Sequence, residues 1–204
     1  MTQGVILVNG KPITKLGSTV DPEKDKISVH GKLVSRPVVF TYIAVNKPIG
    51  IVSSRSAQGR DKTIYDLVPG SRPLAIAGRL DKDSEGLVIL TNDGELVHRL
   101  THPRFQHEKE YVVETSKSIT ASALNKLRRG VRLDEGVAMV DSIVPHATAT
   151  YRLVLHQGWK RQIRRMIGAV RNDVRRLKRT RIGRLELGPL KTGGWRAVKR
   201  SEIL

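Results

Sequence analysis

Four carboxylic acids lie close together in the stretch GRLDKDSEGLVILTNDGEL, residues 78–96. They are Asp81, Asp83, Glu85 and Asp93, and the run between the last two is largely apolar. Carboxylates at such short spacings can coordinate a metal ion, work as an acid–base pair, cap turns and helices, or supply one nucleophile. The neighbouring residues distinguish these chemistries.

Calcium binding is the first possibility, because DKDSEG places oxygen donors at positions 1, 3 and 5 of an EF-hand loop and glycine at position 6. Position 12 is Asn92, however, whereas the EF-hand geometry requires a bidentate glutamate there. The histidines His102, His107 and His156 show no metal-ligand spacing either. We therefore expect no metal site.

A glycosidase-type pair is the second possibility, and it requires two carboxylates that face each other across a bond. Asp81 and Asp83 are only two residues apart, and a strongly basic protein is a poor partner for a neutral sugar. For Asp83, Glu85 and Asp93 we expect structural roles, with Glu85 exposed and Asp93 in a hairpin turn.

Asp81 differs from the other acids, because it follows the apolar run PLAIA and then Gly78-Arg79-Leu80. A strand would thus deliver Asp81 to the loop at its end, where rigid structure commonly holds catalytic groups. Gly78 and Gly86 allow unusual dihedral angles or close backbone approach on either side. Asp81 is therefore the best candidate for a nucleophile.

The elements that must position these residues are short strands and helices without regular alternation. Predicted strands cover residues 42–45, 74–77, 87–91, 109–116, 137–144 and 150–156, and predicted helices cover residues 95–100 and 118–129. A further helix of roughly three turns is predicted where Ile163, Met166, Ile167 and Val170 recur at helical spacing. This mixture indicates the α+β class.

Composition excludes several classes of function. The chain has 204 residues and no cysteine, which rules out disulfides, cysteine nucleophiles and thiolate zinc sites. No run of about 18 apolar residues occurs, so we expect no membrane span. The first residues lack the pattern of a secretory signal, and we expect a cytoplasmic protein.

Positive charge is concentrated in the last quarter of the chain. The formal net charge is +18, and residues 151–204 carry 16 lysines and arginines against three acidic residues. Such a field favours a polyanion, with phosphate contacts supplying much of the affinity. Glycines and Pro189 interrupt the basic segment, so it does not read as an amphipathic helix on a membrane surface. Nucleic acid is the expected partner.

The run GRLDKDSEGLVILTNDG resembles the central motif of the RNA pseudouridine synthases, in the branch that modifies ribosomal RNA. Further segments resemble other motifs of this family in the family's order, namely NKPIG (46–50), HEKEYVVE (107–114) and GWKRQIRRM (158–166). The resemblance runs from about residue 41 to residue 200. It departs from the family at Trp159-Lys160, where Arg-Asn is usual.

The resemblance implies a catalytic domain at residues 39–204, with a mixed, largely antiparallel sheet and flanking helices around a central basic cleft. Residues 1–38 resemble the second half of an S4 RNA-binding domain. We expect a partial S4-like segment there, without the helices with which such a domain normally begins. Within it, Asn9-Gly10, Asp21-Pro22 and His30-Gly31 predict turns between short strands.

The activity implied by the resemblance is that of an isomerase, which converts uridine in RNA to pseudouridine. The uridine must first be flipped out of its stack. A carboxylate can then add to the sugar or take a proton from it without a metal or cofactor. The resemblance assigns this role to Asp81, and implies that Arg164 holds Asp81 ionised while Tyr111 stacks on the base and helps to remove the proton from C5.

Further expectations concern substrate contacts and partners. Residues expected to contact RNA or to line the cleft are Arg79, Lys47, Arg161, Gln162 and Arg165. The implied substrate is ribosomal RNA or a ribosome assembly intermediate, and the segments LTHPRFQHEKEYVV and RLKRTRIGRLELGPLKTGGWR favour large-subunit (23S) RNA. We expect a monomer that needs no cofactor. The alternative is a non-catalytic RNA-binding assembly factor on the same scaffold.

Overall fold

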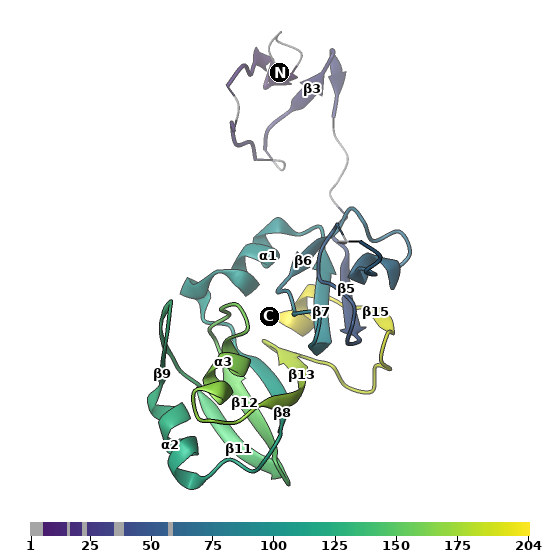
Figure 1. Ribbon diagram of the computed structural model, residues 1–204. Coiled ribbons are helices and arrows are strands. Elements are labelled where there is room, and N and C mark those ends of the chain that lie inside the picture. The colour runs from purple at the N-terminus through teal and green to yellow at the C-terminus, as the bar shows by residue number, and fades with distance from the viewer. Residues whose placement is uncertain (1–5, 16, 22–23, 35–38, 57–58) are drawn as a thin grey trace. The chain divides into compact units, whose positions relative to one another are not determined.

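The computed structural model describes residues 6–15, 17–21, 24–34, 39–56 and 59–204. The chain forms two compact units, Met1–Val39 and Phe40–Leu204 (Figure 1). No helix within the described ranges combines the length and the apolar character needed to cross a membrane.

The small unit contains a four-stranded antiparallel sheet. Its strands are β1 (Ile6–Val8), β2 (Lys11–Pro12), β3 (Ile27–Val29) and β4 (Lys32–Leu33), in the order β2-β1-β3-β4. Asn9-Gly10 and His30-Gly31 connect the hairpins, and all four residues have positive φ, from 48° to 79°. Two-residue turns of this kind follow the twist of the strands. These two predicted turns are confirmed, whereas Pro22 of the third lies outside the described residues.

The large unit is built on a nine-stranded mixed sheet (Figure 1). Its strands are β5 (Tyr42–Lys47), β6 (Ala75–Ala77), β7 (Glu85–Thr91), β8 (Lys109–Thr115), β11 (Ser142–Ala147), β12 (Thr150–Leu155), β13 (Val174–Ile182), β14 (Leu185–Glu186) and β15 (Trp195–Ala197). The main path has the order β11-β12-β8-β13-β7-β5-β15, with β14 beside β13 and β6 beside β7. Neighbours run antiparallel except β13 and β7, which are parallel. The expected α+β fold with a largely antiparallel sheet is confirmed.

The helices of the large unit are short. They are α1 (Gly94–Thr101), α2 (Ala121–Arg129), α3 (Gln162–Gly168) and α4 (Arg200–Ile203), with 3₁₀ turns η1 (Ile64–Asp66) and η2 (Pro103–Phe105). A separate hairpin pairs β9 (Val131–Leu133) with β10 (Gly136–Ala138), so the single strand expected at residues 137–144 is divided between β10 and β11. Helix α3 has about two turns and not three, because the chain leaves it after Gly168 and Arg171 adopts a left-handed conformation (φ +58°).

Strand β13 joins two halves of the sheet. The half containing β5, β6, β7 and β15 lies on one side of it, and the half containing β8, β11 and β12 lies on the other. Between β13 and β7 the register pairs Lys178 with Glu85 and Arg179 with Gly86. Gly86 has φ +106°, and a Cβ there would lie 2.3 Å from the carbonyl oxygen of Arg179. Only glycine permits this close approach of the two strands.

Strand β7 is buried on both faces, which explains its continuous apolar sequence. Leu87 and Ile89 pack in a cluster with residues of α1 and α4, whereas Val88 and Leu90 pack in a second cluster that includes residues of η1 and α3. Glu85, at the start of the strand, is 4% exposed and forms an ion pair with the Arg176 side chain. The expectation that Glu85 is exposed was therefore wrong, because the cover over β7 extends to its first residue.

Asp93 caps a helix. Its carboxylate accepts a hydrogen bond from the backbone N–H of Leu96 at 2.9 Å, and α1 begins at the next residue, Gly94. The same carboxylate accepts a hydrogen bond from the Tyr42 hydroxyl at 2.9 Å. The predicted hairpin turn at Asp93 is therefore wrong, since the residues that follow it form a helix and not a second strand.

Candidate active site

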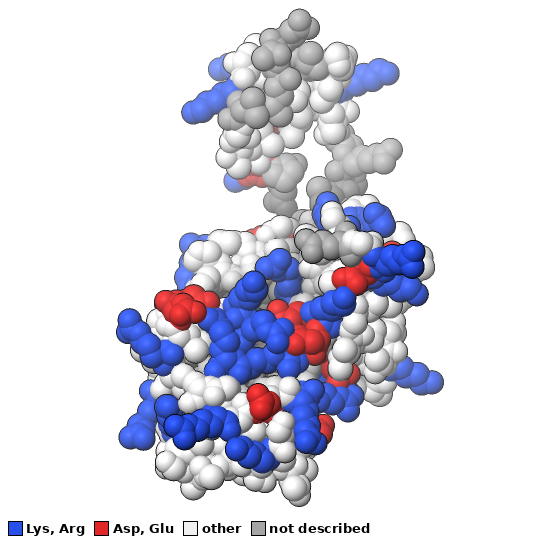
Figure 2. Space-filling model, in the orientation of Figure 1, with Lys and Arg blue, Asp and Glu red and all other residues white. Residues whose placement is uncertain are grey.

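A cleft of about 1080 Å³ is lined from both halves of the sheet. The loop between β6 and β7 forms one wall, and the segment from Leu155 to Ile163 forms another. Among the described residues that line it, the charged ones are one acid, Asp81, and six cations: Arg79, Lys82, Lys109, Lys160, Arg161 and Arg179. Figure 2 shows one face of the large unit, on which lysine and arginine side chains gather over the middle with a few acids among them. A cleft of this charge suits a polyanion.

Asp81 lies on the loop that follows β6. The loop leaves the strand at Gly78 (φ +84°), and its backbone is held by hydrogen bonds from Leu80 N to Ser53 Oγ (3.2 Å) and from Ser84 N to the Asp81 carbonyl (3.1 Å). The Asp81 side chain is half-buried and lines the cleft. Within the described part of the chain, no hydrogen bond or ion pair engages its carboxylate. The fixed backbone thus presents a free carboxylate to a ligand.

Tyr111 lines the cleft from β8 and is 7% exposed. Lys109, two residues earlier, lies on the same face of the strand and also lines the cleft. Its Nζ donates to the carbonyls of His107 (3.1 Å) and His156 (3.5 Å). Burial, and then the charge of Arg179, lowers the pKa of Lys109 to about 8. The wall beside Tyr111 is therefore positively charged at neutral pH.

Arg164, on α3, does not contact Asp81. Its Nη2 donates to the carbonyl of Asp83 (2.7 Å) and its Nη1 to the carbonyl of Val174 (3.0 Å). Its Nε lies 3.3 Å from the Asp83 carboxylate. The expected direct contact with Asp81 was wrong, because Asp83 presents both its carbonyl and its carboxylate to α3. Arg164 thus anchors the far end of the Asp81 loop.

Three of the expected substrate contacts line the cleft, namely Arg79, Arg161 and Gln162. Arg79 is exposed on the Asp81 loop. Arg161 precedes α3 and pairs with the Asp83 carboxylate at 2.9 Å. Gln162 is 4% exposed, and its Nε2 donates to Oε1 of Gln157 at 2.7 Å, which fixes the segment before α3.

Lys47 is fully buried and does not line the cleft. Its Nζ donates to the carbonyls of Pro48 (3.0 Å) and Ile51 (2.8 Å). Burial lowers the pKa of Lys47 to about 8, although the charges of Asp83 and Asp81 oppose that shift. The expected contact of Lys47 with RNA was wrong, because the side chain is turned inward to support the backbone of residues 48–51.

Arg165 contacts the hairpin of β9 and β10. Its two terminal nitrogens donate to the carboxylate oxygens of Glu135 at 2.8 Å and 2.7 Å. This bidentate pair lowers the pKa of Glu135 and holds α3 against the hairpin. Arg165 does not line the cleft, because its guanidinium pairs with an acid of the hairpin, and its contact with RNA stays a prediction.

Arg179, on β13, is a cleft residue that the sequence analysis missed. It is 2% exposed. Its Nε donates to the carbonyl of Leu87 (2.7 Å), its Nη2 to that of Gly78 (2.7 Å) and its Nη1 to that of Arg79 (3.4 Å). Arg179 thus ties the start of the Asp81 loop to β13. One signal in the sequence could have identified Arg179. It lies two residues after Leu177, the one apolar residue of the basic run RLKRTR, and so shares the buried face of the strand with it.

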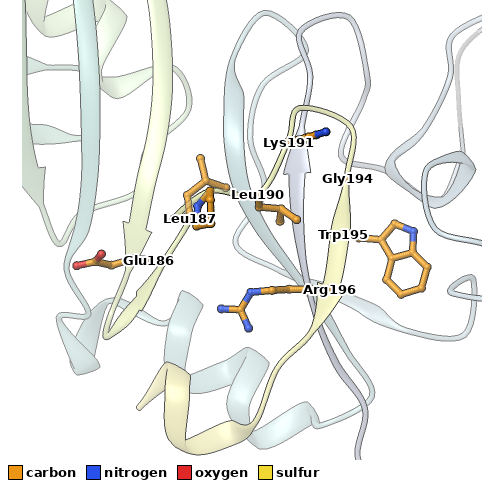
Figure 3. A pocket seen from close by; sticks show the side chains of 9 residues that line it. Glu186, Leu187, Leu190, Lys191, Gly194, Trp195 and Arg196 are labelled. Carbon is orange, nitrogen blue, oxygen red and sulfur yellow. The ribbon is translucent and has the colours of Figure 1, made fainter.

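A smaller hollow of about 420 Å³ lies beside β14 and β15 (Figure 3). Figure 3 shows the Trp195 ring and the Arg196 side chain on opposite sides of β15, with Leu190 on the side of Arg196. Glu186, the one carboxylate among its lining residues, points away from Leu190. In the described ranges, no cluster of His, Asp and Glu suits a metal ion. The larger cleft, which Asp81 and Tyr111 line, is therefore the candidate active site.

Comparison with known proteins agrees with this geometry. Residues 41–169 match the family described as RNA pseudouridylate synthase. An uncharacterized RNA pseudouridine synthase of Mycobacterium tuberculosis is 38% identical over 212 residues, which cover 100% of this chain and 83% of the relative. The dual-specificity RNA pseudouridine synthase RluF of Escherichia coli is 38% identical over 204 residues, which cover 99% of this chain and 69% of the relative. A crystal structure of a pseudouridylate synthase superposes with a TM-score of 0.76 at 29% identity, over 99% of this chain and 88% of that one. The chain therefore belongs to the RNA pseudouridylate synthase family and is an isomerase that acts on uridine in RNA.

Proposed function

We propose that Asp81 is the nucleophile of this isomerase and that its substrate is ribosomal RNA, in particular large-subunit RNA. The observation that carries the assignment is an unpaired carboxylate, held on a fixed loop, in a cleft whose other charged lining residues are cations. The cations attract the phosphates of the RNA, and the single carboxylate faces the sugar of a flipped nucleotide.

The reaction needs no external reactant. The N1–C1′ bond of the uridine breaks while the Asp81 carboxylate adds to C1′ or removes a proton from the sugar. The base rotates and C5 bonds to C1′, while the bond between Asp81 and C1′ breaks or, in the second route, the proton returns to the sugar. The proton then leaves C5 and N1 gains one. Tyr111, which also lines the cleft, stacks on the base and assists the removal of the C5 proton.

Two arginines position the nucleophile. Arg179 holds the start of the loop through the carbonyls of Gly78 and Arg79, and Arg164 holds its end through Asp83. Asp81 lies between these two anchors. A catalytic group that is held from both sides keeps its geometry when the substrate enters. Such fixed orientation of the reacting groups lowers the activation barrier of the reaction.

Ribosomal RNA is supported by the sequence resemblance to the branch that modifies it. The segments LTHPRFQHEKEYVV and RLKRTRIGRLELGPLKTGGWR favour the large subunit. The S4-like sequence of the small unit adds a second candidate contact with RNA. Each phosphate that the protein neutralises adds about 0.7 to 0.9 to the slope of log Kd plotted against the logarithm of the salt concentration.

The test is pseudouridine mapping on unmodified ribosomal RNA, both naked and in assembly intermediates. The wild type should modify a uridine in large-subunit RNA, and Asp81→Asn should modify none while its RNA affinity stays roughly unchanged. Asp134→Asn, in which the carboxylate is fully exposed outside the cleft wall, is the matched control and should behave as the wild type. Turnover by Asp81→Asn would exclude the nucleophile assignment. Modification of small-subunit RNA alone, or of no ribosomal RNA, would exclude the proposed substrate.

A further inference from the structure

Three histidines and a phenylalanine meet where α1 is followed by η2. The ring centroids of His98 and His102 are 5.0 Å apart, and those of His98 and Phe105 are 5.5 Å apart. His107 is stacked on Phe105 at an interplanar angle of 24°. The whole chain has six histidines and two phenylalanines, so these four residues, here named the ring cluster, hold half of the histidines and one of the phenylalanines.

Two arginines lie over the ring cluster. The Arg104 guanidinium carbon is 4.5 Å from the centroid of Phe105, and that of Arg99 is 6.0 Å away. Arg99 reaches the carboxylate of Glu95 at 3.9 Å. In the described part of the chain, no acidic side chain is paired with Arg104. The cluster therefore combines aromatic faces with positive charge.

The ring cluster is not the hydrophobic core of this corner. The residues that pack α1 onto the sheet are Leu96 and Leu100, which are 0% and 2% exposed. His98 and His102 are exposed, and Phe105 and His107 are half-buried. Packing of the helix therefore does not require the rings.

The cluster lies at the rim of the cleft. Its four residues are interleaved in the sequence with residues that line the cleft, which are Val97, Leu100, Thr101, Pro103 and Gln106. The Nε2 atom of His107 is shielded from solvent and has no hydrogen-bond partner in the described ranges. The rim thus offers aromatic faces and positive charge next to the cleft.

We propose that the ring cluster is a stacking subsite for unpaired nucleobases of the RNA on either side of the target uridine. The proposal rests on the proposed function, because Asp81 defines where the flipped nucleotide lies. A base that leaves the helix removes a stacking partner from its neighbours. The rings replace that partner, since a base can stack on His or Phe whatever its identity. Arg99 and Arg104 attract the adjoining phosphates.

The experiment measures RNA binding by fluorescence anisotropy, with Asp81→Asn as the parent so that no probe is converted. The probes are a single-stranded oligouridine and an RNA duplex with the same number of phosphates, because a duplex hides its base faces. His102→Leu and the double variant His102→Leu/Phe105→Leu remove rings, whereas His102→Tyr keeps a ring. His146→Leu, at an exposed histidine on β11, is the matched control.

Stacking of one base is worth about 1–3 kcal/mol, a factor of roughly 5 to 150 in Kd. His102→Leu should therefore weaken single-strand binding at least about fivefold, and the double variant should weaken it further. Duplex binding should change little, and His102→Tyr and His146→Leu should bind both probes as the parent does. His102 is exposed, and His102→Leu removes its ring together with the hydrogen bond that the ring accepts from the Arg104 N–H at 3.2 Å. His102→Tyr loses the same hydrogen bond but keeps a ring, so the pair tests the proposal even if the double variant does not fold.

Equal losses for the two probes would show that the corner acts through charge alone, and no loss for either would show that the rings only pack against one another. Either result overturns the stacking subsite. Both remain distinct from a failure of the proposed function, because the binding measurement uses a protein without turnover. If Asp81→Asn were active in the mapping experiment and the ring variants still lost single-strand affinity, the nucleophile assignment would fall and the subsite would stand.

Discussion

The contact between Gly86 and Arg179 makes Gly86→Ala a sharp test of how the two halves of the sheet are joined. A Cβ at residue 86 would lie 2.3 Å from the carbonyl oxygen and 2.6 Å from the backbone nitrogen of Arg179. Both neighbours are backbone atoms, so no side-chain movement relieves the clash. The strands β7 and β13 must separate, and their parallel pairing at this point is lost.

The expected cost follows from three contributions. A non-glycine residue at φ +106° is strained by about 1–2 kcal/mol. The pairing hydrogen bonds lost between the strands contribute about 1 kcal/mol each. Movement of β13 also displaces the Arg179 side chain, which donates three hydrogen bonds to backbone carbonyls. We expect Gly86→Ala to lower the free energy of unfolding by about 3–5 kcal/mol, a large part of the 5–15 kcal/mol typical of a domain.

Gly70→Ala is the matched control. Gly70 also has positive φ (+73°), but a Cβ there would meet nothing within 4 Å. This variant should carry the backbone strain alone, about 1–2 kcal/mol. The difference of about 2–3 kcal/mol corresponds to a difference in Tm of roughly 4–12 °C for a protein of this size.

Thermal and urea unfolding followed by tryptophan fluorescence provides the measurement. Trp159 and Trp195 are the two tryptophans of the chain, and both belong to the large unit, so the signal reports on that unit alone. If Gly86→Ala and Gly70→Ala unfold at the same temperature and urea concentration, the close approach of β7 and β13 does not limit stability. The reasoning from the Cβ distances would then be refuted.

Two other predictions concern buried cations. Arg179→Lys keeps the charge but cannot reach three carbonyls, so pseudouridine formation should slow by about 100-fold while RNA affinity stays roughly constant. Arg175→Lys, at an exposed position on the same strand, is the control. A normal rate for Arg179→Lys would exclude the anchoring role. For Lys47, the pKa is about 8 in the folded protein against 10.5 ordinarily, so between these values the unfolded chain binds more protons and stability rises with pH. The free energy of unfolding should increase from pH 8 to pH 10, and Lys47→Met should reduce the increase without removing the share of Lys109. Identical pH profiles for the two proteins would contradict the buried, charged state of Lys47.

Local sequence was sufficient to predict the elements that deliver Asp81, the proposed nucleophile. An apolar run followed by Gly-Arg-Leu-Asp predicted a strand and then a loop, and Asp81 lies on the loop after β6. The apolar run at residues 87–91 predicted a buried strand, and β7 is indeed covered on both faces. Motif resemblance also placed Arg79, Tyr111, Arg161 and Gln162 in the cleft wall.

Features that depend on distant partners could not be predicted. The sequence alone does not show whether Arg164 contacts Asp81 or Asp83, because these acids are only two residues apart. The path of the loop in the folded chain places Asp83 against Arg164. The role of Asp93 is different, because the helix predicted at residues 95–100 follows it directly and already favoured a helix cap over a turn. Strand β13 has the sequence VRRLKRTRI, which does not alternate between apolar and polar residues. Its burial comes from its place between β8 and β7, which the local sequence does not show. Arg179 was missed for this reason.

The position of β13 between the two halves of the sheet has a consequence for the synthesis of the protein. The ribosome releases the strands that carry the Asp81 loop and Tyr111 before it releases residues 174–182. Until then β7 and β8 each keep an unpaired edge, the kind of edge on which strands from other chains can dock. A nascent chain that stalls before β13 thus has both walls of its active site but nothing that holds them in register. We therefore expect the enzyme to become competent only when this late strand is in place, and a chain that ends before β13 to aggregate and to lack activity.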